Sequence, residues 1–197
     1  MGNVGVCLGG RRLQRAVFLD RDGVVNRAEV RGGRPYAPRR LEDFRLLRGV
    51  AGAVAALREA GFRIVVVTNQ PDIASGLVDP AVVEAMHAQL RARLPIDAIE
   101  MCAHSQDEGC ACRKPRPGLL LAAARRFFVD LRRSFVIGDR WHDIVAGREA
   151  GCYTVFIDRG YRERRPVGAD AVVGSLPAAV RRIMMLVAVE RVGKGET

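Results

Sequence analysis

Short apolar runs alternate along the chain with longer segments of helical periodicity, and this alternation constrains the fold more than any other feature. The runs with strand character are AVFL (16–19), FRIVVVT (62–68), AIEMCA (98–103), SFVIG (134–138) and YTVFID (153–158). The helical segments are residues 48–61, 79–94, 116–128 and 143–151. Strands that alternate with helices predict an α/β fold, with a central and mainly parallel sheet covered by helices on both faces.

The chain has the length of a single domain. It contains 197 residues, of which 49% are hydrophobic, enough for one well-buried core. We expect this domain to span residues 15–192, between a flexible N-terminus over 1–14 and a short tail over 193–197. We also expect an edge strand at 171–176 and an amphipathic helix at 177–192. A long loop rich in Arg, Gly and Pro is expected at 27–43.

Arginine supplies nearly all of the positive charge. The formal net charge is +10, and Lys114 and Lys194 are the only lysines. This surplus favours anionic ligands, from phosphorylated metabolites to nucleic acid. The arginines are scattered and aromatic residues make up 6% of the chain, which disfavours a nucleic-acid surface. No apolar run approaches the roughly 18 residues of a membrane helix, so we expect a cytoplasmic monomer or weak dimer without a membrane partner.

Polar residues follow three of the predicted strands at the point where each strand ends. Asp20 follows the first run, Thr68 closes the second, and Asp139 follows the fourth. In an open parallel sheet, ligands bind beyond the carboxyl ends of the strands. We therefore expect these side chains to meet in one site.

The stretch DRDG at 20–23 places two carboxylates two positions apart. Taken alone, it also fits a strand followed by an acidic turn. A divalent cation between Asp20, Asp22 and a bound phosphate would relieve their repulsion. A carboxylate can attack phosphorus to give an aspartyl-phosphate. Asp20 is therefore the candidate nucleophile and Asp22 the candidate general acid and base, while Gly23 allows the backbone to turn sharply.

Three further fragments fit chemistry on a phosphate. Thr68 and Asn69 can donate hydrogen bonds to phosphate oxygens. Arg113 and Lys114 precede a predicted helix, where Lys114 would offset the charge shared by Asp20 and the phosphoryl group. In VIGDRWHDI, Asp139 supplies a further carboxylate for the metal, and Asp143 follows one helical turn later to support the site. Four such fragments in this order, on successive strand ends, favour a metal-dependent phosphatase.

A second metal site is predicted between residues 102 and 112. Cys102, His104, Cys110 and Cys112 provide three thiolates and one imidazole, a complete tetrahedral set for structural zinc. The alternatives are buried cysteines beside an incidental histidine, or an iron–sulfur site. Bound zinc would close the loop that carries Arg113 and Lys114 and so position them.

The fragments DRDGVVN, TNQ, RKP and GDRWHD together resemble the four motifs of the haloacid dehalogenase superfamily of phosphatases, over about residues 16 to 160. The resemblance implies a Rossmann-like three-layer sandwich that lacks a large cap domain. It also implies roles for the motif residues: Asp20 as nucleophile, Asp22 as acid/base and as metal ligand through its carbonyl, Thr68 and Lys114 as phosphate holders, and Asp139 as magnesium ligand.

The loop pattern C-x-H followed by C-x-C-R-K-P narrows this resemblance within subfamily IIIA. It is similar to two groups that use magnesium for chemistry and zinc for structure. These are the D-glycero-D-manno-heptose-1,7-bisphosphate 7-phosphatases, which we favour, and the histidinol-phosphate phosphatases. A nucleic-acid end-processing phosphatase or binding protein is the alternative from another class.

Some residues depart from the heptose group or stay unassigned. Pro71 and Asp72 alter the turn after TNQ, and Ser75 stands where that group often has an arginine. Arg113, with Arg39 and Arg40 of the loop, would bind a second phosphate, although for the loop arginines a solvated surface is the simpler interpretation. Four residues stay unassigned. We expect His87 to be a surface histidine and Cys152 to be a buried cysteine, and Trp141 and His142 to lie at the rim of the metal site.

Overall fold

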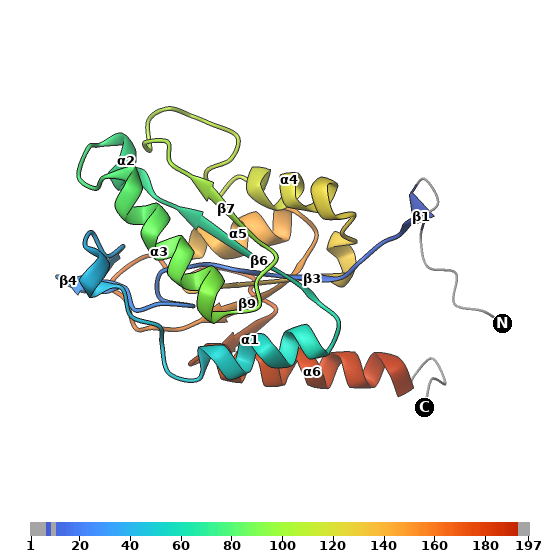
Figure 1. Cartoon of the computed structure of the whole chain (residues 1–197). Coiled ribbons are helices and arrows are strands. Elements are labelled where there is room, and N and C mark those ends of the chain that lie inside the picture. The colour runs from blue at the N-terminus through green and yellow to red at the C-terminus, as the bar shows by residue number, and fades with distance from the viewer. Residues whose placement is uncertain (1–6, 9–10, 193–197) are drawn as a thin grey trace.

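A six-stranded sheet forms the centre of the computed structural model, which describes residues 7–8 and 11–192. The strand order is β10-β9-β8-β3-β6-β7, and every neighbouring pair is parallel. The strands are β3 (Ala16–Leu19), β6 (Arg63–Asn69), β7 (Ala98–Cys102), β8 (Phe135–Gly138), β9 (Tyr153–Ile157) and β10 (Ala171–Val173). The predicted parallel sheet is therefore confirmed, and β3 lies at its centre between β6 and β8 (Figure 1).

Helices cover both faces of this sheet, as the alternation predicts (Figure 1). One face packs against α1 (Val50–Glu59), α3 (Pro80–Arg93) and α6 (Leu176–Val192), and the other against α4 (Gly118–Phe127) and α5 (Trp141–Glu149). The result is the expected three-layer sandwich.

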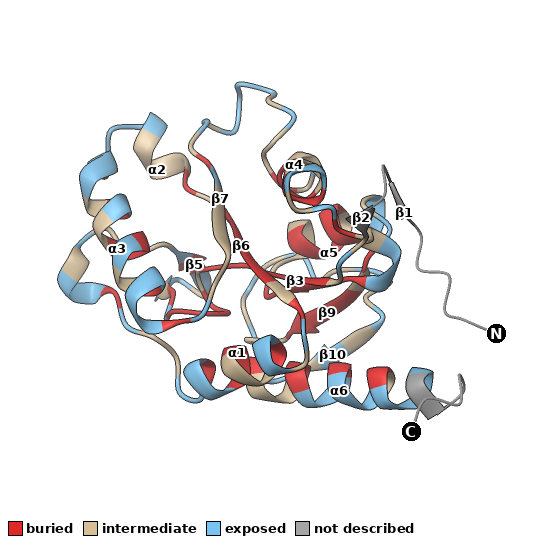
Figure 2. Ribbon diagram, turned by 45° about the vertical axis from the view of Figure 1, so that its right-hand side comes forward, coloured by how far each residue is buried: buried red, intermediate tan, exposed pale blue. Residues whose placement is uncertain are grey.

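Strand β3 shows why the chain folds this way. Val17 and Leu19 point into the core beneath α1 and α6, whereas Ala16 and Phe18 point into the core beneath α4. Side chains alternate between the two faces of a strand, so a strand covered on both faces has to be apolar throughout. All four residues are fully buried, as the red colour of β3 in Figure 2 shows.

Local signals set the start of α3. Asp79 is its N-cap, with a side chain that accepts a hydrogen bond of 2.7 Å from the backbone amide of Ala81. Pro80 occupies the first helical position, where its missing N–H leaves no hydrogen bond unmade. These two residues set the start of the helix that the sequence predicts over 79–94.

The prediction of a loop over 27–43 is wrong. A hairpin forms there from β4 (Glu29–Arg31) and β5 (Arg34–Tyr36), followed by the short 3-10 helix η1 (Leu41–Asp43). The turn between the strands is Gly32-Gly33, with φ of 58° and 80°. Two consecutive residues with positive φ form the turn that suits a two-residue hairpin, and glycine adopts it without strain. Between β3 and β6 the described chain adds only this hairpin, η1 and α1, and no large cap.

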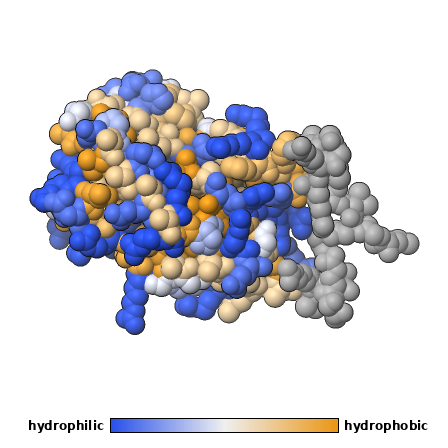
Figure 3. Space-filling model, in the orientation of Figure 1, coloured by the Kyte–Doolittle hydropathy of each residue, from blue (hydrophilic) through white to orange (hydrophobic). Residues whose placement is uncertain are grey.

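At the N-terminal end, β1 (Cys7–Leu8) pairs antiparallel with β2 (Arg11–Arg12). The remaining elements are a short helix α2 (Pro71–Ala74) and a 3-10 helix η2 (Leu131–Arg133). Residues 1–6 and 9–10 of the N-terminus expected to be flexible, and the tail 193–197, lie outside the described residues. None of the described helices is long and apolar enough to cross a membrane. Hydrophilic and apolar residues are interspersed on the face shown in Figure 3.

Candidate active site

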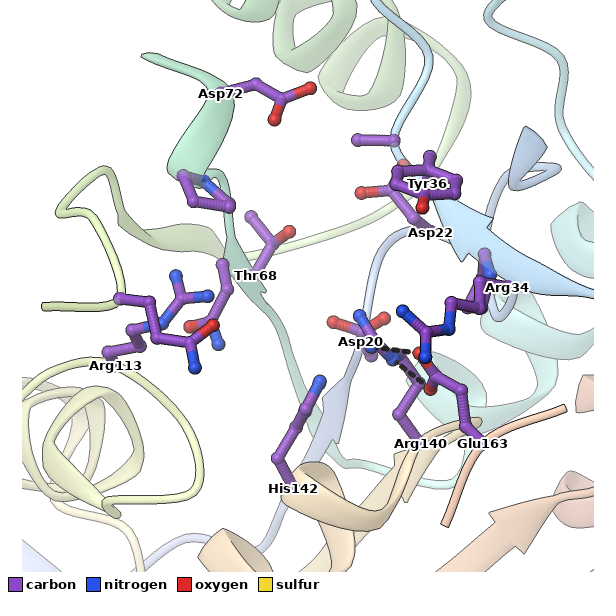
Figure 4. Close-up of a pocket in the computed structure, with 15 residues that line it drawn as sticks. Asp20, Asp22, Arg34, Tyr36, Thr68, Asp72, Arg113, Arg140, His142 and Glu163 are labelled. Carbon is purple, nitrogen blue, oxygen red and sulfur yellow. Dashed lines mark hydrogen bonds and ion pairs between the residues drawn. The ribbon is translucent and has the colours of Figure 1, made fainter. Parts of the chain in front are cut away.

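The predicted meeting of polar side chains at the strand ends is found in the structure. Asp20 follows β3, Thr68 lies near the end of β6, and Asp139 follows β8. Since β3 is hydrogen-bonded to both β6 and β8, Asp20 stands between the other two residues. Asp20 and Thr68 line a pocket of about 310 Å³ at this edge of the sheet (Figure 4).

An acidic cluster adjoins this pocket and shares Asp20 with it. Carboxylate oxygens of Asp20, Asp139 and Asp143 fall within 4.8 Å of one another. Asp139 is buried, and its carboxylate oxygens accept no well-formed hydrogen bond among the described residues, although the Tyr161 hydroxyl lies close enough to oppose the rise of its pKa. Burial, and then the charges of Asp20 and Asp143, raise the pKa of Asp139 well above its ordinary value. Buried oxygens with so few donors, in a group of carboxylates, fit a hard divalent cation.

Glycine is required opposite Asp139. Gly23 has a φ of 89°, and a Cβ atom on it would lie 1.8 Å from Oδ2 of Asp139. No side chain fits there, and the positive φ would strain any other residue. The glycine of the DRDG motif therefore makes room for the carboxylate that follows β8.

Lys114 supplies the positive charge within the cluster. Its buried Nζ lies 2.5 Å from Asp20 Oδ1 and 2.6 Å from Asp143 Oδ1, and it donates a 2.8 Å hydrogen bond to the Val67 carbonyl. Burial alone lowers the pKa of Lys114, but the carboxylates of Asp143 and Asp20 outweigh this and raise it. Lys114 is therefore charged at neutral pH.

The two carboxylates beside Lys114 respond differently to the same cation. Burial raises the pKa of Asp20 to about 6, although Lys114 opposes that effect. Burial would also raise the pKa of Asp143, but Lys114 and then His142 lower it below its ordinary value. Asp143 is thus the permanent counter-ion of Lys114, while Asp20 is the carboxylate whose charge needs a further cation.

Asp22 points away from this cluster, and donors surround it. Asn26 Nδ2 lies 2.9 Å from Oδ1, and Gln70 Nε2 lies 2.8 Å from Oδ2. The Arg21 guanidinium contacts both oxygens at 3.1 Å. The side chain of Asp22 is therefore held in place without help from the acidic cluster. This arrangement is compatible with the expected metal ligation through its backbone carbonyl.

The residues that close β6 connect the other motifs. Gln70 Nε2 also donates a 2.8 Å hydrogen bond to Thr68 Oγ1, and so bridges Thr68 and Asp22. Asn69 donates to the Lys114 carbonyl at 3.1 Å and accepts from the Lys114 amide at 3.2 Å. We expected Asn69 to donate to phosphate; in the structure its amide group holds the backbone of Lys114 beside the site.

The four predicted zinc ligands converge. His104 Nδ1 lies 3.5 Å from Cys102 Sγ and 3.2 Å from Cys112 Sγ, and Cys110 Sγ lies 3.6 Å from Cys102 Sγ and 3.4 Å from Cys112 Sγ. Ligands on a tetrahedron around zinc lie about 3.5 to 3.8 Å apart, given typical Zn–S and Zn–N bond lengths. The four side chains therefore fit a closed tetrahedral zinc site.

The wall of the pocket contains residues that the sequence did not assign to the site. Arg34, Tyr36 and Glu163 line it together with Arg113, and His142 extends into it from the start of α5 (Figure 4). Arg140 pairs with Glu163 through contacts of 2.8 and 2.5 Å. Among the described residues, no carboxylate pairs with Arg34 or Arg113. The Gly-Gly turn at 32–33 is the signal that could have revealed Arg34, because a hairpin there projects β5 toward the site.

The loop arginines named as candidate phosphate ligands have other partners. Arg39 Nε lies 2.7 Å from Asp72 Oδ2, and Arg40 pairs with Glu42 at the surface. Asp72, one of the departures after TNQ, thus ties α2 to the segment that follows β5. Because both arginines are paired, Arg34 replaces them as the cation that the loop contributes to the pocket.

The prediction that His87 is a surface histidine is wrong. It is 3% exposed and accepts a hydrogen bond of 3.1 Å from Arg21 Nη1. Along α3, His87 lies four residues after Val83 and three before Leu90, both buried. That spacing places all three on one helix face, and it was the signal that could have predicted the burial.

Acid is expected to destabilise the fold through His87. Burial, and then the Arg21 charge, lower its pKa from 6.5 to about 4. A lowered histidine pKa gives stability that is present above pH 6.5 and lost as the pH falls toward 4. Urea unfolding measures the effect. Between pH 7 and pH 5 the free energy of unfolding should fall by about 2 kcal/mol more in wild type than in His87→Gln, because glutamine cannot be protonated. An equal loss in both proteins would contradict a buried neutral histidine.

Comparison with known proteins agrees with this geometry. A family model described as haloacid dehalogenase (HAD) hydrolase-like matches residues 111–179. The chain is 37% identical over 151 residues to D-glycero-beta-D-manno-heptose-1,7-bisphosphate 7-phosphatase of Bordetella bronchiseptica, covering 74% of this chain and 82% of that protein. It is also 37% identical over 165 residues to the enzyme of that name from Pseudomonas aeruginosa, covering 81% and 89%.

A solved structure extends the similarity to the whole domain. The crystal structure of D,D-heptose 1,7-bisphosphate phosphatase from B. bronchiseptica, complexed with magnesium and phosphate, aligns with a TM-score of 0.76 at 32% identity. The alignment covers 87% of this chain and 99% of that one.

Proposed function

The chain belongs to the heptose-bisphosphate phosphatase family of the haloacid dehalogenase superfamily, and we propose that its substrate is D-glycero-D-manno-heptose 1,7-bisphosphate, from which it removes the 7-phosphate. The observation that carries this proposal is the pocket itself. Asp20 lies at its base beside the Asp139 cluster, while Arg34 and Arg113 stand without acidic partners on its wall. One phosphate would react at Asp20, and the other would be held by the arginines.

In the proposed mechanism Asp20 attacks the phosphorus of the 7-phosphate. The bond from phosphorus to the sugar oxygen breaks, and Asp22 gives its proton to the leaving alkoxide. Asp22 then takes a proton from water, which attacks the aspartyl-phosphate and releases phosphate and free Asp20. Lys114, at 2.5 Å from Asp20 Oδ1, offsets the charge that builds up on the phosphoryl oxygens, and Thr68 donates a hydrogen bond to them.

Magnesium would be held by Asp20, Asp139 and the backbone carbonyl of Asp22, with Asp143 in support. The buried oxygens of Asp139, which accept no well-formed hydrogen bond among the described residues, support this assignment. When bound, the ion would neutralise the carboxylates and the phosphate and align the phosphoryl group for attack. Cysteines that hold zinc have to stay reduced, which supports a cytoplasmic enzyme formed by residues 15–192.

One zinc ion per chain is proposed for the cysteine cluster. Elemental analysis of protein purified without chelators should find that zinc, and Cys112→Ser should lose it. Since Arg113 and Lys114 follow Cys112 directly, the variant should also lower kcat by about tenfold. Cys152→Ala, which changes a cysteine outside the cluster, serves as the control and should keep its zinc. Zinc-free wild type with full activity would refute the site.

Arg34 and Arg113 are expected to recognise the second phosphate. Charge-assisted hydrogen bonds to phosphate are strong, so Arg34→Ala and Arg113→Ala should each raise KM for the bisphosphate about tenfold, with kcat within about twofold. Arg40→Ala, whose guanidinium pairs with Glu42 at the surface, should leave KM unchanged. A rise in KM of the same size for a sugar monophosphate would contradict recognition of a second phosphate.

The substrate itself is tested by a panel. Initial rates of phosphate release are compared for heptose 1,7-bisphosphate, fructose 1,6-bisphosphate, histidinol phosphate and a 5′-phosphorylated oligonucleotide. The account predicts the highest kcat/KM for the heptose ester. Two arginines without acidic partners favour a second anion over the ammonium group of histidinol phosphate. A higher kcat/KM for histidinol phosphate or for the oligonucleotide would overturn the substrate assignment.

A further inference from the structure

Arg21 is a buried cation between the two aspartates of the first motif. Its exposed fraction is 0%, and it is the largest of the fully buried side chains among the described residues. The guanidinium holds Asp22 through three contacts, at 3.2 Å from Nε to Oδ1 and at 3.1 Å from Nη2 to each oxygen. Asp22 is its only ion-pair partner among the described residues. Both the position and the rotation of the Asp22 carboxylate are therefore set from one side by a planar group.

His87 fixes the other side of that guanidinium. Nη1 of Arg21 lies 3.1 Å from Nε2 of His87, which reaches it from α3, 66 residues further along the chain. A guanidinium only donates, so Nε2 has to accept, and the imidazole is neutral with its proton on Nδ1. The lowered pKa of His87, caused by burial and by the Arg21 charge, agrees with this state. Phe44 lies beneath the guanidinium, with its ring centroid 5.9 Å from Cζ.

We propose that Arg21, oriented by His87, is a positioning residue that aims the Asp22 carboxylate at the leaving oxygen of the substrate. The proposal rests on the proposed function, in which Asp22 gives its proton as the bond from phosphorus to the sugar oxygen breaks. Proton transfer requires a donor in hydrogen-bonding reach and correctly oriented. Gln70 and Asn26 complete the support of Asp22, while His87 links that support to the core packing of α3.

Two substrates with different leaving groups can distinguish positioning of the acid from a purely structural role of Arg21 and His87. p-Nitrophenolate leaves without a proton, whereas a sugar alkoxide needs one. Single-turnover rates of the first half-reaction are measured with enzyme in excess, using p-nitrophenyl phosphate and heptose 1,7-bisphosphate. If wild type does not hydrolyse the heptose ester, fructose 1,6-bisphosphate takes its place. The proteins compared are wild type, Asp22→Asn, His87→Leu, His87→Gln and Arg21→Lys.

We expect the variants to lose rate selectively with the sugar ester. His87→Leu and Arg21→Lys should slow the reaction of the sugar ester at least about tenfold and that of the aryl ester less than about threefold. Asp22→Asn should show the same selectivity more strongly. Glutamine can still accept the Arg21 hydrogen bond, so His87→Gln should recover most of the rate with the sugar ester. Should His87→Leu fail to fold by circular dichroism, Arg21→Lys gives the same comparison.

Two outcomes would overturn the positioning role alone: equal slowing of both esters in His87→Leu and Arg21→Lys, or no slowing of either, while Asp22→Asn remains selective. A different outcome would overturn the proposed mechanism and the positioning role together, namely Asp22→Asn slowing both esters equally. The assignment of Asp22 as acid and its positioning by Arg21 are thus tested separately in one set of measurements.

Discussion

Replacement of Asp20 by asparagine is expected to lower kcat on the order of 10⁴-fold or more, because it removes the proposed nucleophile. The fold should survive. Burial raises the pKa of the Asp20 carboxyl to about 6, so its charged form destabilises the native state increasingly as the pH rises from 3.8 through 6. A neutral asparagine avoids that penalty. Phosphate release from the heptose ester and urea unfolding at pH 7 measure the two effects.

Asp20→Glu provides the matched control for charge. It keeps the carboxylate beside Lys114 but moves it by one methylene, and the near-attack geometry is lost when a reacting atom shifts by about 1 Å. Both variants should therefore be inactive while differing in stability. More than about 1% of the wild-type rate in Asp20→Asn would contradict the assignment of Asp20 as nucleophile.

Replacement of Lys114 by methionine should cause the largest loss of stability. It leaves Asp20 and Asp143 buried without their cation, and removal of one partner from a buried ion pair costs about 3 to 5 kcal/mol. The raised pKa of Lys114 means that its contribution is fully present below pH 10.5, and hence at pH 7. Loss of charge stabilisation in the transition state should also lower kcat on the order of 10³-fold. Urea unfolding and steady-state kinetics at pH 7 measure both.

A double variant separates these two effects. Lys114→Met with Asp143→Asn removes one of the carboxylates that Lys114 neutralises, so part of the lost stability should return while the activity stays low. Arg125→Ala, on the surface of α4, should change the unfolding free energy by less than about 0.5 kcal/mol. Wild-type stability in the Lys114→Met single variant would contradict the buried charge cluster.

The sheet could be predicted because its strands are buried on both faces. Such strands have to be apolar at every position, as β3 is from Ala16 to Leu19, and runs of this kind are visible in a sequence. Parallel strands also bring their carboxyl ends to one edge of the sheet, which is why the sequence predicts that Asp20, Thr68 and Asp139 lie there. The convergence of Cys102 and Cys112 was predictable for a related reason, since close spacing in the chain brings these two cysteines together in space.

Contacts between distant segments could not be predicted in this way. The Arg21–His87 hydrogen bond depends on how α3 docks beside the first motif, and no local pattern encodes that docking. The pocket wall depends on where the β4–β5 hairpin lies, so the sequence reveals neither that Arg34 lines the pocket nor that Arg39 pairs with Asp72. The two hydrogen bonds between the Asn69 side chain and the backbone of Lys114 also join segments that are distant in the chain, so the sequence does not reveal them.

Direct detection of the covalent intermediate tests the central claim, which is that phosphoryl transfer proceeds through Asp20. The enzyme is mixed with magnesium and heptose 1,7-bisphosphate, quenched in acid within milliseconds, and reduced with borohydride, which converts an aspartyl-phosphate to homoserine. Peptide mass spectrometry then locates the reduced residue. The account predicts homoserine at position 20, dependent on substrate and absent from Asp20→Asn. Phosphate release at the full rate with no reduction at position 20, or with reduction at another carboxylate, would contradict it.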